Sequence, residues 1–140
     1  ISEGATVSDE LKEPTDLPDL SPSEWEVMKV IWKHGPLAAR DVYARMPDQT
    51  NWSYATVKTL LRRIVQKGWV AYDQIGNSYL YRAAVRREKA VSSAIGDFSS
   101  RVLDGVLSPF VAYFARQKNL SEEDIAQLEK IIEEHRKREE

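Results

Sequence analysis

The sequence of 140 residues predicts a mainly α-helical protein with one small antiparallel β-hairpin, an α+β fold. Two observations lead to this prediction. Apolar residues recur at helical spacing between residues 20 and 67 and again between residues 88 and 138. Between these regions, residues 69–72 and 79–82 are short runs of β-forming residues on either side of a turn-rich junction at 75–78. The expected order is therefore three helices, a hairpin and three further helices.

The first expected helix begins after a proline-containing acidic segment. Residues 1–19 hold many acids and no apolar period, so we expect a disordered N-terminal tail. Folded structure is expected to begin at Ser21, an N-cap that forms a capping box with Glu24, while Pro22 suits the first helical position. The helix is expected to end near Gly35.

Residues 54–67 carry the clearest helical pattern in the chain, after a short helix at 38–46, a turn at 47–51 and the N-cap Ser53. One wide face of this helix is apolar, and it consists of Val57, Leu60, Leu61, Ile64 and Val65. The other face carries hydroxyls and cations, and the segment has no carboxylate. One side is thus expected to pack on a core and the other to face a ligand. Lys67, at the far end, is expected to be a solvated charge or to interact with the helix dipole.

The region after residue 86 is expected to form three helices, two of them starting after the serines Ser108 and Ser121. Their apolar stripes are too extensive for one small domain to cover. Pairing with a second copy would bury them, and a two-fold dimer is the default arrangement; the alternative is that they pack only on their own domain. The expected interface residues are Phe98, Val102, Phe110, Phe114, Ile125, Leu128, Ile131 and Ile132.

Charge is distributed unevenly along the chain. The net charge is −2, but residues 51–90 carry eight Lys or Arg against two acids, whereas residues 1–20 carry six acids and one Lys. A basic middle between acidic ends is the pattern expected of a phosphate-binding surface, although a merely solvated basic helix face would look the same.

The order helix, short helix, basic helix, hairpin is that of a winged helix-turn-helix. In this fold the third helix enters the DNA major groove, where Arg or Lys reads guanine edges and Thr contacts thymine or phosphate. The hairpin, or wing, reaches the backbone or the minor groove. The expected DNA-binding residues are Ser53, Tyr54, Ala55, Thr56, Lys58, Thr59, Arg62 and Arg63 on the recognition helix 54–67, and Asn77, Ser78 and Arg82 on the wing.

Four segments in order resemble the penicillinase-repressor family, which includes β-lactamase and methicillin-resistance repressors and copper-responsive repressors. They are residues 20–28 (LSPSEWEVM), 56–63 (TVKTLLRR), 67–68 (KG) and 79–81 (YLY), and the likeness spans about residues 20–138. The resemblance implies a winged-helix domain at 20–85, a helical dimerisation domain at 86–140, and repression of transcription at palindromic double-stranded DNA operators. It also implies a bacterial protein connected with antibiotic resistance.

The resemblance further suggests how repression ends. The copper-responsive branch uses clustered C-terminal cysteines, which this chain lacks. The β-lactam branch carries an Asn-Phe bond that is cut when a membrane sensor metalloprotease is triggered, and the matching position here is Asp97-Phe98. Asp replaces Asn at this position, which departs from the family pattern. The alternative is that Phe98 is simply a core residue and Asp97 a solvated acid.

Several functional classes are not expected. The two histidines, His34 and His135, form no metal-ligand pair, and no glycine-rich phosphate loop is present, so we expect neither an enzyme nor a cofactor or metal. The absence of cysteine excludes disulfides and fits a reducing cytoplasm. The longest mostly apolar stretch, 105–115, is too short for membrane insertion.

Two alternatives to an operator-binding repressor stay open. A winged helix can serve as a protein–protein interaction module, although such domains often lose the cations of the third helix. A repressor of this fold could also sense a small ligand, for which the apolar region 110–114 could line a pocket.

Overall fold

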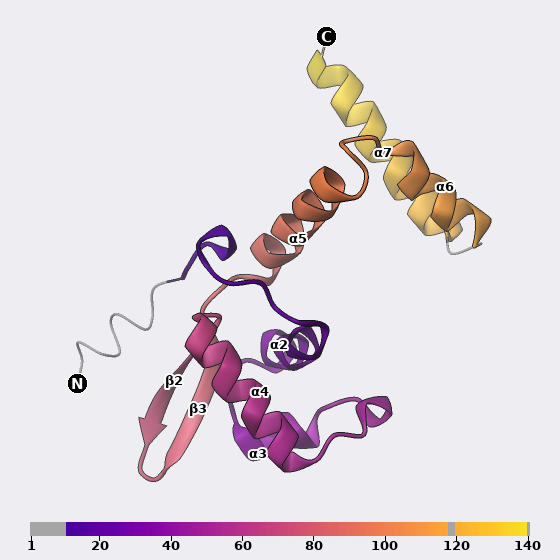
Figure 1. Ribbon diagram of the computed structural model, residues 1–140. Coiled ribbons are helices and arrows are strands. Elements are labelled where there is room, and N and C mark those ends of the chain that lie inside the picture. The colour runs from indigo at the N-terminus through magenta and orange to yellow at the C-terminus, as the bar shows by residue number, and fades with distance from the viewer. Residues whose placement is uncertain (1–10, 118–119, 140) are drawn as a thin grey trace. The chain divides into compact units, whose positions relative to one another are not determined.

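The computed structural model describes residues 11–117 and 120–139, and its elements confirm a mainly helical chain with a small antiparallel sheet (Figure 1). Two units are distinguished, one up to Ala94 and one from Ile95. The expected boundary after residue 85 lies too early, because Ala90 in the first turns of α5 (Arg87–Arg101) is buried in the core of the first unit. The boundary therefore falls inside α5.

Helix α2 (Pro22–His34) begins as the sequence predicts. The Ser21 side chain accepts a hydrogen bond from the Glu24 backbone N–H, and the Glu24 carboxylate accepts one from the Ser21 backbone N–H. This reciprocal pairing satisfies two N–H groups that a bare helix end would leave without partners. Gly35, with φ of 80°, follows the last turn.

Helix α4 (Tyr54–Lys67) has the bounds predicted for the recognition helix. The shorter α3 (Ala39–Ala44) and the 3-10 turn η2 (Asp48–Thr50) precede it. The Ser53 side chain caps it by accepting from the Thr56 backbone N–H at 3.1 Å. Gly68 ends it at φ of 91°, a backbone region that residues with a Cβ rarely adopt.

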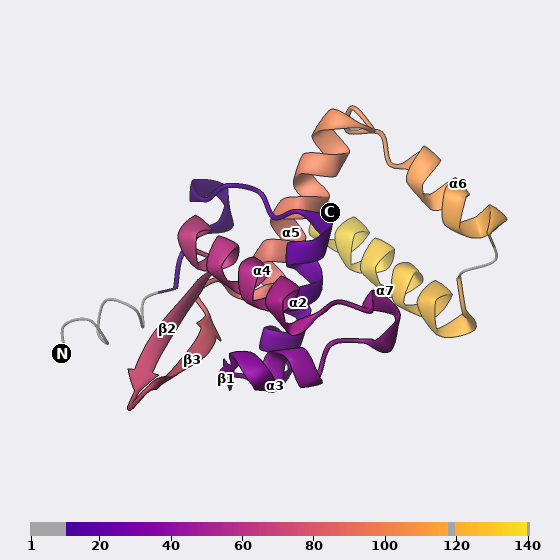
Figure 2. The same cartoon turned by 60° about the horizontal axis from the view of Figure 1, so that its bottom comes forward.

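Strands β2 (Val70–Ile75) and β3 (Ser78–Ala83) form the predicted hairpin, and Figures 1 and 2 show it projecting beyond helices α2 to α4. The strands pair from Val70 with Ala83 to Ile75 with Ser78, which leaves a two-residue turn. Gly76 takes a positive φ of 62° at the first turn position, where such hairpins favour glycine. The sequence did not indicate the third strand, β1 (Leu37–Ala38), which pairs with the outer edge of β3.

Apolar side chains from α2, α3, α4 and the sheet form one core in the first unit. Its buried members are Val27, Met28, Val30, Ile31, Leu37, Val42, Val57, Leu60, Leu61, Ile64, Trp69, Val70, Val85 and Ala90. Trp52 packs against the edge of this core, and the Trp69 ring is 4% exposed, so both side chains serve packing.

The expected disordered tail is wrong for residues 11–19, whereas residues 1–10 lie outside the described part. A 3-10 turn, η1 (Pro14–Asp16), forms there and buries Pro14. The backbone N–H of Lys12 donates to the Ala84 carbonyl at 2.7 Å, and the Trp69 indole donates to the Pro18 carbonyl at 2.8 Å. Leu17 packs on the core. These contacts fix the segment against the end of α4 and the start of the sheet.

The second unit contains the end of α5, α6 (Ser108–Arg116) and α7 (Glu122–Glu139). Ser121 caps α7 as predicted, through its Oγ and the Asp124 backbone N–H at 3.0 Å. Ser108 does not act as a cap, because α6 already starts at this residue and Leu107 is its N-cap. No described residue from Ile95 onwards is buried. None of the helices described here has the length and apolar character to cross a membrane.

Candidate nucleic-acid interface

The two faces of α4 differ sharply in burial. Val57, Leu60, Leu61 and Ile64 are between 0% and 4% exposed. The opposite face turns to solvent, with exposed Ala55, Thr56, Lys58, Arg62 and Arg63 and a half-buried Thr59. Ala55, Thr56, Thr59 and Arg63 also border a shallow surface hollow. The structure thus places most of the predicted DNA-binding residues of this helix together on one exposed surface.

Ser53 has a structural task at the start of this surface. Its Oγ accepts from the Thr56 backbone N–H and lies 3.1 Å from the Thr56 Oγ1. This oxygen already accepts the capping hydrogen bond, so the main role of Ser53 is to stabilise the start of the helix.

Tyr54 lies at the centre of a cluster that joins α3 to α4. The Arg40 guanidinium lies over its ring, 4.0 Å from the ring centre, and the Lys58 Nζ is 5.4 Å from the same centre. The Tyr43 ring meets it edge-on at 5.6 Å between ring centres. The sequence reasoning named neither Arg40 nor Tyr43. The sequence feature that could have pointed to Arg40 is its position as a cation at the start of the short helix that precedes the recognition helix.

The hairpin carries a second aromatic cluster. Tyr72 and Tyr81 are paired across β2 and β3, and Tyr79 lies 4.6 Å from Tyr72 between ring centres. Burial raises the pKa of Tyr81, and the neighbouring Tyr54, Tyr72 and Tyr79 act in the same direction. The Tyr81 hydroxyl therefore stays neutral at physiological pH.

The three wing residues that were predicted to bind DNA differ in their exposure and contacts. Asn77 in the turn and Ser78 at the start of β3 are exposed. Arg82 differs from expectation, because its Nε donates to the Asp73 carboxylate at 3.0 Å and its side chain is only 16% exposed. The structure thus ties Arg82 to Asp73 across the strands of the hairpin, and its contact with a phosphate stays a prediction.

Lys67 is also placed differently from the solvated charge expected. Its Nζ donates to the carboxylate of Glu24, a residue only 2% exposed, and to the Asp19 carbonyl. Burial alone would raise the pKa of Glu24, but hydrogen bonds from Lys67 and Ser21 and the Lys67 charge outweigh it, so this pKa lies below its ordinary value. Lys67 therefore anchors the end of α4 to the N-terminal segment.

In the second unit, Asp97 and Phe98 both lie within the helical backbone of α5 and are exposed. All eight predicted interface residues are exposed except Phe114, which is half-buried. Phe98, Phe110 and Phe114 form a chain of edge-on ring contacts, at 6.1 Å and 5.0 Å between ring centres.

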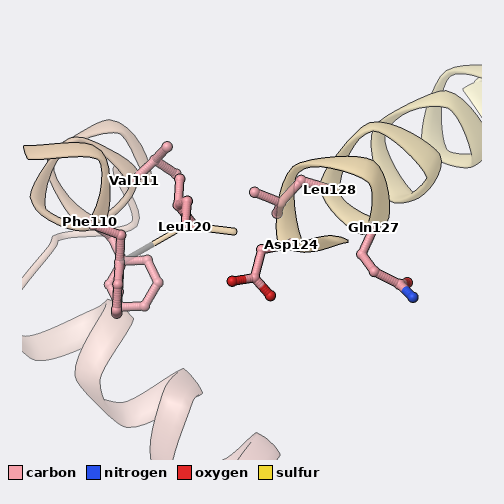
Figure 3. Close-up of a pocket in the computed structure, with 7 residues that line it drawn as sticks. Phe110, Val111, Leu120, Asp124, Gln127 and Leu128 are labelled. Atoms are coloured by element: carbon pink, nitrogen blue, oxygen red, sulfur yellow. The ribbon is translucent and has the colours of Figure 1, made fainter. Parts of the chain in front are cut away.

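Helices α6 and α7 border an open hollow of about 350 Å³. Figure 3 shows Phe110, Val111 and Leu120 on one side of it and Leu128 and Asp124 on the other. The Asp124 carboxylate accepts from the Ser121 backbone N–H at 3.1 Å. Across the described ranges, no group of three or more His, Cys, Asp or Glu side chains is placed to hold a metal ion.

Comparison with known proteins adds to this geometry. The family model described as penicillinase repressor matches residues 20–134. The penicillinase repressor of Bacillus licheniformis is 32% identical over 122 residues, which cover 87% of this chain and 95% of that protein. The methicillin resistance regulatory protein MecI of Mammaliicoccus sciuri is 26% identical, covering 81% of this chain and 93% of that protein.

A solved structure of monomeric Bacillus licheniformis BlaI in complex with the blaP half-operator is 32% identical, with a TM-score of 0.46, and covers 52% of this chain and 89% of that chain. The family model spans most of the chain and includes α2, α4, the hairpin and α5 to the middle of α7. The chain therefore belongs to the penicillinase repressor family, a family of DNA-binding transcriptional repressors rather than of enzymes.

Proposed function

We propose that this protein is a homodimeric repressor that binds a palindromic DNA operator through α4 and the β2–β3 wing. The observation that carries the proposal is the outer face of α4. Lys58, Arg62 and Arg63 are exposed there, and the helix contains no acid. Such a face matches the negative phosphates and the acceptor-rich base edges of the major groove.

The position of each side chain suggests its task. Lys58 and Thr59 lie near the middle of the helix face and would meet base edges. Arg62 and Arg63, one turn later, would meet bases or flanking phosphates. Tyr54, Ala55 and Thr56 belong to the first turn, near the capping Ser53, where a helix N-terminus favours phosphate. Asn77 and Ser78 would hydrogen-bond the backbone beside the groove, and a phosphate contact of Arg82, which is ion-paired with Asp73, stays a prediction.

The second unit supports pairing of two chains. Large apolar side chains are exposed along all three of its helices, for example Phe98 at 40% on α5, Phe110 at 38% on α6 and Ile131 at 58% on α7. Large exposed apolar patches mark interaction sites on proteins. A two-fold dimer would cover it and would present two α4 helices to the half-sites of a palindrome.

Release from DNA is proposed to follow a cut of the Asp97–Phe98 bond by a membrane sensor metalloprotease, as the family resemblance suggests. The cut would separate most of the second unit from the DNA-binding half and leave monovalent, weaker binders. Both residues are exposed, but the bond lies in a helix that must unwind locally first. Cells exposed to a β-lactam should then contain two fragments that meet after residue 97. Intact repressor throughout induction contradicts this step.

DNA binding is tested by measuring duplex affinity over a range of salt concentrations. Binding through several phosphates weakens steeply with salt. Lys58→Ala is expected to lose about 1–3 kcal/mol on a sequence selected by the wild-type protein, and less on random duplex, because it reads a base edge. Lys29→Ala is the matched control, since Lys29 is exposed on α2 and paired with Glu26 at 3.0 Å. Salt-independent or absent binding would favour the protein–protein module.

A second candidate is a repressor of the same fold that responds to a small apolar ligand. The hollow between α6 and α7 favours it, because its lining is mostly apolar with one carboxylate, from Asp124 (Figure 3). A second copy lying on α6 and α7 would fill the same hollow. An apolar fluorescent probe that binds the protein at low concentration and is displaced as dimer forms would support the second copy, whereas binding unaffected by dimerisation would support a ligand site.

A further inference from the structure

The Tyr54 ring brings together two cations from different helices. Arg40 belongs to the first turn of α3, and its guanidinium lies 4.0 Å from the ring centre. Lys58 belongs to α4, one turn after Tyr54, and its Nζ lies 5.4 Å from the same centre. Two like charges repel, so their approach to one ring needs a compensating attraction. The electron-rich face of the aromatic ring supplies it.

Arg40 is held in place without being neutralised. The nearby acid of α3, Asp41, pairs with Arg45 one turn further on, at 3.9 Å. Among the described residues, Arg40 forms no ion pair, and its side chain is exposed. A guanidinium held over a ring without an ion pair still has N–H groups to donate, and its planar fork matches the oxygens of a phosphate in a two-point contact.

We propose that Arg40 contacts a backbone phosphate of the bound DNA, and that Tyr54 is the positioning residue that holds Arg40 over its ring. The proposal deepens the proposed function and rests on it. In a helix-turn-helix the helix before the recognition helix crosses the DNA backbone, and α3 occupies this position in the chain. Tyr54 then acts through the cations on its ring, and Tyr43 supports the ring from its edge.

The first measurement is the salt dependence of binding by the full chain, with a mixed-sequence duplex of about 30 base pairs, long enough for two half-sites. Arg40→Ala is expected to weaken binding about five- to tenfold near 0.1 M salt and to lower the slope of log K against log salt by about one unit, because one phosphate contact is lost. The matched control is Arg45→Ala at the C-cap of α3, which should leave the slope unchanged. An unaltered slope for Arg40→Ala overturns the proposal.

The second measurement concerns the positioning role. Tyr54→Phe keeps the ring and loses only the hydroxyl, so it should keep the wild-type salt slope and bind more tightly than Tyr54→Leu, which should weaken binding about as much as Arg40→Ala. The double variant Arg40→Ala/Tyr54→Leu should be no weaker than either single variant, because both remove one contact. A Tyr54→Phe variant that binds DNA as weakly as Tyr54→Leu overturns the role of the ring. So does a double variant whose loss of affinity equals the sum of the two single losses. Circular dichroism and thermal unfolding confirm that each variant is folded.

The two proposals fail in different ways. If the wild-type protein binds the duplex with a steep salt dependence and only the Arg40 and Tyr54 variants behave otherwise than expected, the further inference fails alone. If the wild-type protein shows no salt-dependent binding, the proposed function fails and the inference fails with it.

Discussion

The two units of this chain contain similar helices, but the first buries many of its apolar side chains and the second leaves its apolar side chains exposed. In the first unit, α2, α3, α4 and the start of α5 each bury at least one side chain, and Val27, Val57 and Ile64 have no exposed surface. In the second unit no described residue is buried. Both units use serine caps and apolar stripes, so helix-forming signals alone do not make a core. The first unit has its core within one chain, whereas the second exposes the apolar side chains that the proposed dimer would cover.

The largest expected effect is the loss of a core side chain from the first unit. Leu61 is 1% exposed, so Leu61→Ala should lower the free energy of unfolding by about 2–5 kcal/mol through lost burial and the resulting cavity. Urea denaturation followed by tryptophan fluorescence measures this change. The matched variant is Leu128→Ala, at 38% exposure in the second unit. A similar loss for both variants in dilute protein would remove the contrast between the units.

Dimer formation, in contrast, should depend on the apolar side chains of the second unit. In a two-fold dimer each substitution occurs twice, so Leu128→Ala is expected to weaken the dimer by about 2–4 kcal/mol. Sedimentation equilibrium over a concentration series gives this value. Leu61→Ala serves as the reverse control. Monomer at all concentrations for the wild-type protein contradicts the proposed pairing.

The pairing of Glu24 with Lys67 ties the start of the first unit to the end of α4. The pKa of Glu24 lies below its usual value near 4.5, so its ionised form stabilises the fold above that pH. This contribution is lost as the pH falls through the folded-state pKa. Glu24→Gln should therefore cost about 1–2 kcal/mol at pH 7 and flatten the decline of stability in acid. Glu26→Gln, on the exposed side of α2, is the control and should change neither. A Glu24→Gln variant with the wild-type acid profile refutes the role of this pair.

The smallest expected effects come from removing one serine N-cap in each unit. Ser53→Ala removes the cap of α4 and should lower the free energy of unfolding by about 0.5–2 kcal/mol. Ser121→Ala removes the cap of α7, where no core couples helix formation to folding of the chain. It should reduce helix content in dilute protein without moving the main unfolding transition. Circular dichroism distinguishes the two results, and equal shifts of the main transition would argue for a shared core.

The sequence predicted the elements whose signals are local. The bounds of α4 followed from the Ser53 cap, the apolar period and Gly68, and the capping box of α2 followed from Ser21 and Glu24. What it missed depends on distant partners. Strand β1 has two residues and exists through its pairing with β3.

The candidate site shows the same limit. The exposed cations of α4 could be derived from helix periodicity. The partners of Lys67 and Arg82 could not, because Glu24 lies 43 residues before Lys67 and the contact of Arg82 with Asp73 depends on the hairpin register. The acidic, proline-containing segment 11–19 has the composition of a disordered tail, yet Leu17 and the Pro18 carbonyl find partners around Trp69.

The two faces of α4 also bear on how such a protein can change over generations. Substitutions at Lys58 or Arg62 alter an exposed surface, whereas substitutions at Leu61 or Ile64 alter the core. Under the proposed binding mode, stability and sequence preference are therefore encoded by separate positions of one helix. New binding preferences can accumulate on the outer face while the inner face keeps the fold, so the helix can diverge toward new target sequences without a loss of foldability.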